Sequence, residues 1–250
     1  MKKLFSDCLY AARRIWARMC AKHFDHVVMT GYNCELAFRF LRSRGFLDAT
    51  LFCWAGTTVL EDFFSICAHI DDLMTGELLT PTKDMPLFRC AKTGLWAHGR
   101  SHANVWSGDN PPSPEFVESE AKEVRSRILY LKEKTLGYLR DEQSVLVVHK
   151  IRSKYCTKEN ADRTALAVKA AMEGLGARNM TLLIVCEDSV RTNFPMRHPD
   201  YELRSVAVFS PDDDALNPHL GDKRGWDIIF DEFRPKKSLK RRQGKFKFEQ

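Results

Sequence analysis

The sequence predicts an α/β protein: a mostly parallel sheet with helices on both faces (doubly wound, three-layer), an extra N-terminal helix and a basic C-terminal tail. Short apolar runs alternate along the chain with segments whose hydrophobic residues recur at helical spacing. Continuous apolar strands between amphipathic helices are typical of a parallel sheet that is covered on both faces. With 250 residues, 44% of them hydrophobic, the chain is long enough to bury the core of one large domain.

The elements follow from these two patterns, taken in chain order. Apolar runs predict strands at 26–30, 144–148, 181–185 and 204–209, and a further apolar segment spans 49–55. Hydrophobic residues at helical spacing predict helices at 4–20, 34–44, 58–74, 115–140, 159–175 and 226–233. Gly45 is placed as a helix C-cap, and Arg39, Arg42 and Arg44 are placed on the outer face of the helix before it. Residues 76–114 are rich in Pro, Gly, Asn and Ser and are predicted to be irregular, as functional loops often are.

The chain is expected to contain residues 1–25 as an amphipathic helix, 26–234 as a single α/β domain, and 235–250 as a flexible tail. The tail carries seven Lys and Arg residues against one Glu, so it holds the whole net charge of +6 and the rest of the chain is neutral. A neutral body does not favour a specific nucleic-acid partner. A basic tail favours weak contact with an anionic membrane.

Eight unpaired cysteines without a Cys-x-x-Cys spacing suit a reducing compartment. The sequence has no apolar run of the length that spans a bilayer, and arginines interrupt the N-terminal apolar stretch, unlike a signal peptide. We therefore expect a cytoplasmic protein that is at most peripheral at the inner membrane surface. Neither a metal-ligand motif nor a nucleotide-binding glycine motif is present, so no metal and no cofactor are predicted.

The best candidate active centre is the junction Gly31-Tyr32-Asn33-Cys34-Glu35, where a predicted strand turns into a predicted helix. Parallel sheets bind ligands at the carboxyl ends of their strands. A cysteine at a helix N-terminus lies beside unpaired N–H groups and the positive end of the helix dipole, which lower a thiol pKa and hold an oxyanion. Packing of Cys34 in the first helical turn, with Asn33 as a simple cap, is the alternative.

The stretch Val28-Met29-Thr30-Gly31-Tyr32-Asn33-Cys34-Glu35-Leu36-Ala37, then Leu41-Arg42, Phe52-Cys53-Trp54 and Gly225-Trp226-Asp227, resembles a bacterial family of unknown function. Its members are labelled papain-like cysteine peptidases. The resemblance covers most of residues 27–233, in pieces, and implies a cysteine hydrolase with Cys34 as nucleophile. The family's Phe-Asp-Trp reads Phe52-Cys53-Trp54 here, so any role of that Asp is absent or moved. The Gly-x-Asn-Cys turn is also similar to the nucleophile block of SGNH-type hydrolases, with Cys in place of Ser.

A thiol nucleophile needs a base and a group that orients the base. His98, at a point where the resemblance also implies a histidine, is the preferred base, and Asp227 is a candidate to orient it. Three further histidines stay open as the base: His102, beside His98, His149, at the end of an apolar strand, and His219.

The remaining predicted contacts are with the substrate, an unknown small molecule, peptide or glycan. Gly31 and Asn33 are candidates for the oxyanion site, and Trp54 and Trp96 for contacts with the substrate, such as stacking on a sugar ring. The alternative function is a non-catalytic module that binds carbohydrate, such as cell-envelope polysaccharide.

Overall fold

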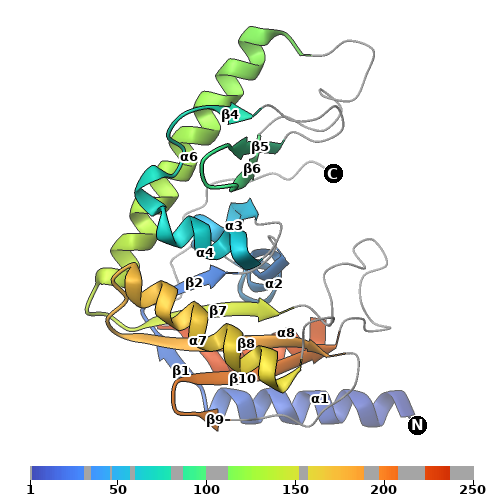
Figure 1. Ribbon diagram of the computed structural model, residues 1–250. Helices are drawn as coiled ribbons and strands as arrows, with labels where there is room; N and C mark the ends of the chain where they lie inside the picture. The colour runs from blue at the N-terminus through green and yellow to red at the C-terminus, as the bar shows by residue number, and fades with distance from the viewer. Residues whose placement is uncertain are drawn as a thin grey trace.

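The computed structural model describes residues 2–30, 35–45, 47–56, 60–79, 87–99, 112–151, 157–188, 197–207 and 223–236. Its helices are α1 (Lys2–Met19), α2 (Glu35–Arg44), α3 (Leu51–Trp54), α4 (Leu60–Ala68), the 3-10 turn η1 (Ile70–Asp72), α6 (Pro114–Arg140), α7 (Lys158–Gly174) and α8 (Lys223–Glu232). The expected helices are therefore confirmed, with α4 shorter than predicted. Figure 1 shows their arrangement.

The main sheet has the strand order β2-β7-β8-β10-β9. Its strands are β2 (His26–Thr30), β7 (Val145–Ile151), β8 (Met180–Asp188), β10 (Tyr201–Ala207) and β9 (Arg197–His198). The first four run parallel, and β9 pairs antiparallel with β10 at the edge. This confirms the predicted α/β fold with a mostly parallel sheet, and β10 begins three residues earlier than the sequence indicated.

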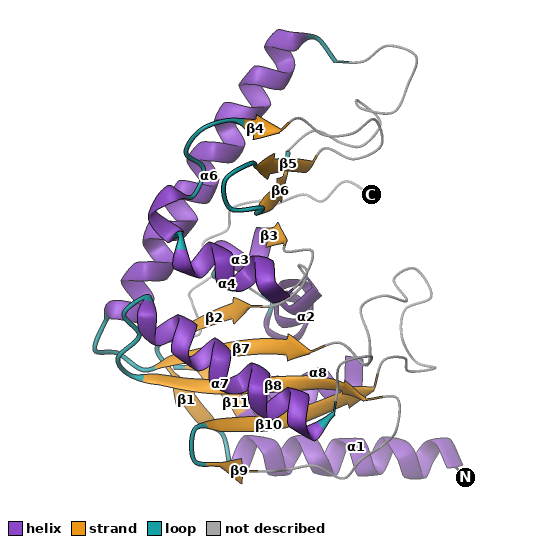
Figure 2. Cartoon of the chain, in the orientation of Figure 1, coloured by secondary structure: helices purple, strands orange, loops and turns teal. Residues whose placement is uncertain are grey.

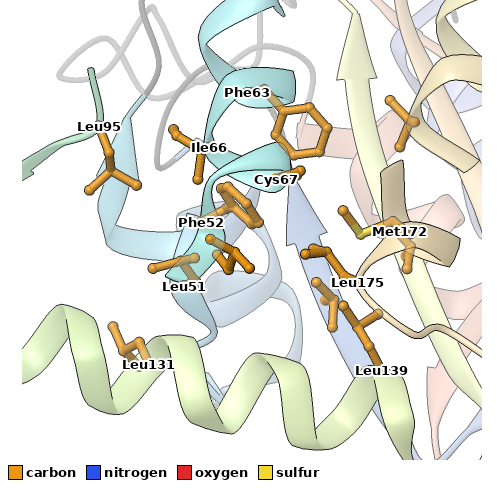
Figure 3. Close-up of a cluster of buried hydrophobic side chains, with 14 of the residues drawn as sticks. Leu51, Phe52, Phe63, Ile66, Cys67, Leu95, Leu131, Leu139, Met172 and Leu175 are labelled. Carbon is orange, nitrogen blue, oxygen red and sulfur yellow. The ribbon is translucent and has the colours of Figure 1, made fainter. Parts of the chain in front are cut away.

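Helices cover both faces of the main sheet, because alternate residues of each strand point to opposite sides. On one face, residues such as Val28, Val147 and Ile184 pack with α4, α6 and α7. Figure 3 shows part of this cluster, including Phe63 and Met172. On the other face, residues such as Met29 and Val148 pack with α2 and α8. Helix α1 then lies against α8, outside that layer (Figure 2).

A second sheet, β3-β6-β5-β4, is the main feature that the sequence did not predict. Its antiparallel strands are β3 (Ala55–Gly56), β6 (Trp96–His98), β5 (Leu87–Cys90) and β4 (Leu78–Leu79). The expectation of an irregular region at 76–114 is therefore wrong for three of these strands. Strands of two to four residues are too short to show an alternating pattern. The long helix α6 extends beside both sheets (Figure 1).

Local signals explain where several helices begin and end. Ser113 Oγ accepts a hydrogen bond from the Phe116 N–H, at 3.3 Å, and Pro114 starts α6, where its missing N–H costs nothing. Thr157 caps α7 in the same way. Gly45 has a φ of 73° after α2, and its N–H donates to the Leu41 carbonyl, which confirms the predicted C-cap.

The two ends of the folded chain meet in a small third sheet. Strand β1 (Lys22–Phe24) pairs parallel with β11 (Phe233–Pro235). The last helix was expected to reach Phe233, but it ends at Glu232 because Phe233 belongs to β11 and its side chain is buried. This pairing fixes the point from which the basic tail leaves, next to the strand that follows α1.

Candidate active site

The predicted cysteine junction lies between two described elements. Strand β2 ends at Thr30 and helix α2 begins at Glu35, as the apolar run and the helical spacing indicated. The predicted oxyanion residues Gly31 and Asn33 and the predicted nucleophile Cys34 lie outside the described residues. In the sequence, Cys34 directly precedes Glu35, the first residue of α2, and follows Thr30, the last residue of β2, by four positions.

Thr30 and His149 form a buried polar pair at this end of the sheet. They are register partners on β2 and β7. The Thr30 hydroxyl donates to the Val148 carbonyl at 3.2 Å, and its oxygen lies 3.0 Å from His149 Nδ1. A hydroxyl has one proton to donate, so with this arrangement Nδ1 is the donor in the second contact. The lone pair of the imidazole is then on Nε2.

His149 is held in its neutral form. Its side chain is buried, and the ring of Phe63 in α4 lies 5.6 Å from it, centre to centre. Burial disfavours the charged imidazolium and lowers the pKa of His149 to about 4. A neutral imidazole can accept a proton, so His149 keeps the chemical capacity of a base at neutral pH.

His98 occupies a different place, at the end of β6 in the second sheet. Its side chain is exposed, and the guanidinium of Arg127 in α6 donates to its backbone carbonyl. Partial loss of hydration around the ring, followed by the positive charge of Arg127, lowers the pKa of His98. The remaining candidate bases, His102 and His219, lie outside the described residues.

Asp227 lies on α8, and the structure does not bring it to His98. The Tyr10 hydroxyl of α1 donates to Asp227 Oδ2 at 2.8 Å. Its neighbour Trp226 packs in the cluster on one face of the main sheet, whereas Ala97, next to His98, packs in the cluster on the other face. The partner found for Asp227 is a tyrosine on α1, in place of the histidine that the sequence suggested.

The two tryptophans and Cys53 complete the predicted set. Trp54 is the last residue of α3, and its side chain is not among those that the structure describes. Trp96 is the first residue of β6 and is partly buried. Cys53 is buried, with its sulfur 3.4 Å from both the N–H and the hydroxyl oxygen of Thr50. Burial raises the pKa of the Cys53 thiol. A neutral buried thiol cannot supply the charge of the aspartate that the similar family has at this point.

Sequence reasoning missed a further charged pair at the carboxyl ends of the strands. Lys150 on β7 is buried and forms an ion pair with Glu187 near the end of β8. The signal was present, because a lysine directly follows His149 in an apolar strand. Buried charges are retained in proteins when they are paired, so this pair marks the same edge of the sheet as polar.

Within the described ranges, no three His, Cys, Asp or Glu side chains are arranged to hold a metal ion. Comparison of the chain with protein-family models, with curated proteins and with solved structures found no match. The resemblance to papain-like cysteine peptidases therefore stays a prediction from the quoted motifs.

Proposed function

We propose that the protein is a cysteine-dependent hydrolase with Cys34 as its nucleophile. The observation that carries the proposal is the position of Cys34, immediately before α2 and four residues after the end of a parallel strand. The first N–H groups of a helix have no partner within the helix, and the helix dipole favours negative charge at that end. Both effects stabilise a thiolate and a developing oxyanion.

In the proposed reaction, the Cys34 sulfur bonds to a substrate carbonyl carbon while a histidine takes the thiol proton. The N–H groups around Asn33 and the start of α2 stabilise the oxyanion, which collapses to a thioester as the leaving group departs with the proton. Water then hydrolyses the thioester and frees the thiol. The proposed substrate class is a small molecule, peptide or glycan, with Trp54 and Trp96 as candidate contacts, and the reaction needs no cofactor.

His98 and His149 are the two described candidates for the proton acceptor, and geometry favours His149. It contacts Thr30, the residue that leads into the cysteine junction. His98 follows β6 in the second sheet. Substituting each histidine with Gln distinguishes the two candidates. The variant that lacks the base loses turnover. The other variant keeps turnover and still shows the decrease of kcat/KM at acidic pH.

The first test is the pH dependence of alkylation by iodoacetamide, read for each cysteine by mass spectrometry. Cys8 and Cys20 are exposed free thiols and serve as matched controls in the same sample. An activated Cys34 titrates with an apparent pKa at or below about 7, well under the ordinary value of about 8.5 for a free cysteine. A Cys34 that titrates with the controls, or does not react, contradicts the proposal.

The second candidate function is a binding module that uses the same edge of the sheet without catalysis, for example toward carbohydrate. The Cys34→Ser variant distinguishes it from a hydrolase. Turnover of a hydrolysed substrate is lost in this variant, while a binding module retains its ligand affinity.

We also propose that the protein works in the cytoplasm, in weak contact with the inner membrane surface through residues 235–250. The support is the cation-rich sequence of this tail, which favours anionic lipid. Weakening of vesicle binding by salt, and its loss on removal of the tail, would be the expected results.

A further inference from the structure

Helix α1 exposes its hydrophobic side. Most of its large hydrophobic side chains are in solvent, with exposed fractions from 45% for Leu9 to 79% for Met19. At 100° per residue they all fall within one side of the helix. The exposed set consists of Leu4, Phe5, Leu9, Ile15, Trp16 and Met19; we call it the α1 apolar face.

The polar side of α1 is the one that contacts the rest of the protein. Asp7 binds Arg224 at 2.7 Å, Tyr10 binds Asp227 at 2.8 Å, and Arg14 binds Asp231 at 2.6 Å. In each pair the partner on α8 follows 217 residues later, so the two helices run parallel in a fixed register. Figure 1 shows α1 along the outer edge of the molecule.

These contacts determine which side of α1 faces outward. Asp231 is fully buried and also binds Arg18, Arg44 and Arg234, so α1 contributes two of the four arginines around this carboxylate. Rotating α1 to bury its apolar face would remove two charged partners from the buried Asp231, and an unpaired buried charge greatly destabilises a folded protein. The apolar face is therefore directed outward by the fold itself.

The last described residue of the basic tail, Lys236, lies beside the end of β1, the strand that follows α1. Strand β1 begins at Lys22, three residues after α1 ends, and pairs with β11, the last described strand. The Lys236 N–H donates to the Phe24 carbonyl at 2.6 Å. From Lys237 onward the sequence carries six more Lys and Arg residues against one Glu. The strongly cationic segment thus follows a strand that pairs with β1, the first strand after the exposed apolar helix.

We propose that α1 lies in the plane of an anionic lipid bilayer, with the α1 apolar face inserted among the acyl chains. A helix with Trp, Phe and Leu on one side and charged residues on the other is the type that binds membranes in this way. No helix in the described part of the chain is long and apolar enough to cross a bilayer, so α1 rests on its surface.

A second copy of the chain is the competing occupant of this face. Two copies of α1 would cover each other's hydrophobic residues but would bring together two chains that each carry a net charge of +6. An anionic bilayer matches both the apolar face and the cations. The proposal is independent of Cys34, and it extends the weak tail contact to a defined insertion surface.

The test is flotation of the full chain with vesicles of phosphatidylcholine mixed with phosphatidylserine, compared with pure phosphatidylcholine. The wild-type chain is expected to float with the anionic vesicles, and Trp16→Glu is expected to lower the partition coefficient by about tenfold or more, because Trp burial is lost and a charge is added. The matched control is Leu166→Glu: Leu166 is 50% exposed on α7, and this change adds the same charge. It is expected to leave flotation unchanged.

Three results would overturn the proposal. The first is a wild-type chain that does not float with anionic vesicles. The second is flotation that does not depend specifically on Trp16. Either the Trp16→Glu and Leu166→Glu variants lose flotation equally, or Trp16→Glu floats like the wild type while removal of residues 237–250 abolishes flotation. In the latter case the tail alone binds the vesicles. The third is a wild-type chain that does not float but forms a dimer in analytical ultracentrifugation, when the Trp16→Glu variant is a monomer.

Discussion

Helices α1 and α7 are both amphipathic, yet they attach to the protein by opposite sides. Helix α7 buries Ala165, Val168 and Met172 against the main sheet, as its pattern predicts. Among the described side chains of α1, only the small side chain of Ala17 is buried. Ion pairs and hydrogen bonds attach helix α1 to α8. Hydrophobic periodicity therefore predicts a helix but not which side of the helix is buried.

The two faces of the main sheet also treat buried polar groups differently. On the face that α8 covers, Asp231 stays charged: burial alone would raise its pKa, but hydrogen bonding and the charges of Arg14, Arg44 and Arg18 lower it below the ordinary value. On the other face, no described residue offers His149 such an opposite charge, and burial keeps it neutral. A buried group keeps its charge only where partners compensate the lost hydration.

The largest effect is expected at the charged contact that holds α1. Asp231→Asn leaves Arg14, Arg44 and Arg234 without their buried carboxylate and should lower the free energy of unfolding by about 3–5 kcal/mol, measured with urea. Asp7→Asn, at a partly exposed pair of the same helix contact, should cost less than about 1 kcal/mol. Equal costs would mean that the buried network does not determine how α1 is attached.

The next effect compares methionines on the two helices. Met172→Ala removes a fully buried side chain of α7 and should cost about 3 kcal/mol, through lost burial and a cavity. Met19→Ala removes a 79% exposed side chain of α1 and should change the free energy of unfolding by less than about 0.5 kcal/mol. A large cost at Met19 in the isolated protein would show that the α1 apolar face is already covered.

The sequence was sufficient to predict the main sheet and most of the helices, because these elements are long enough for their periodicity to show. It could not predict the second sheet, whose strands have two to four residues. It also placed Arg39 and Arg44 on the outer face of α2, whereas Arg39 is buried and Arg44 binds Asp231. That contact joins residues 187 positions apart and leaves no local signal.

The candidate site was predicted only in its local part. A strand that ends at Thr30 and a helix that starts at Glu35 are local features, so the sequence predicted the strand end and, to within one residue, the helix start. The pairing of Thr30 with His149 depends on strand register over 119 positions. The separation of Asp227 from His98 depends on which face of the sheet each element covers. Both are tertiary properties that spacing along the chain does not contain.

The smallest of the three effects concerns His149 and depends on pH. Its pKa is about 4 in the folded protein and about 6.5 when unfolded, so between these values the unfolded chain binds more protons. Stability is therefore fully present above about pH 6.5 and decreases as the pH falls toward 4. From pH 7 to pH 5 the loss from this residue should be about 2 kcal/mol, by linkage between the two pKa values.

The His149→Gln variant isolates this contribution, because every other titrating group is shared with the wild type. Urea unfolding of both proteins at several pH values should show a wild-type free energy that decreases by about 2 kcal/mol more than the variant's over that interval. Carboxylates with lowered pKa values, such as Asp231, lose their contribution only at more acidic pH. Parallel curves for the two proteins would mean that His149 is not buried as a neutral imidazole, and the preference for it over His98 as the base would lose its support.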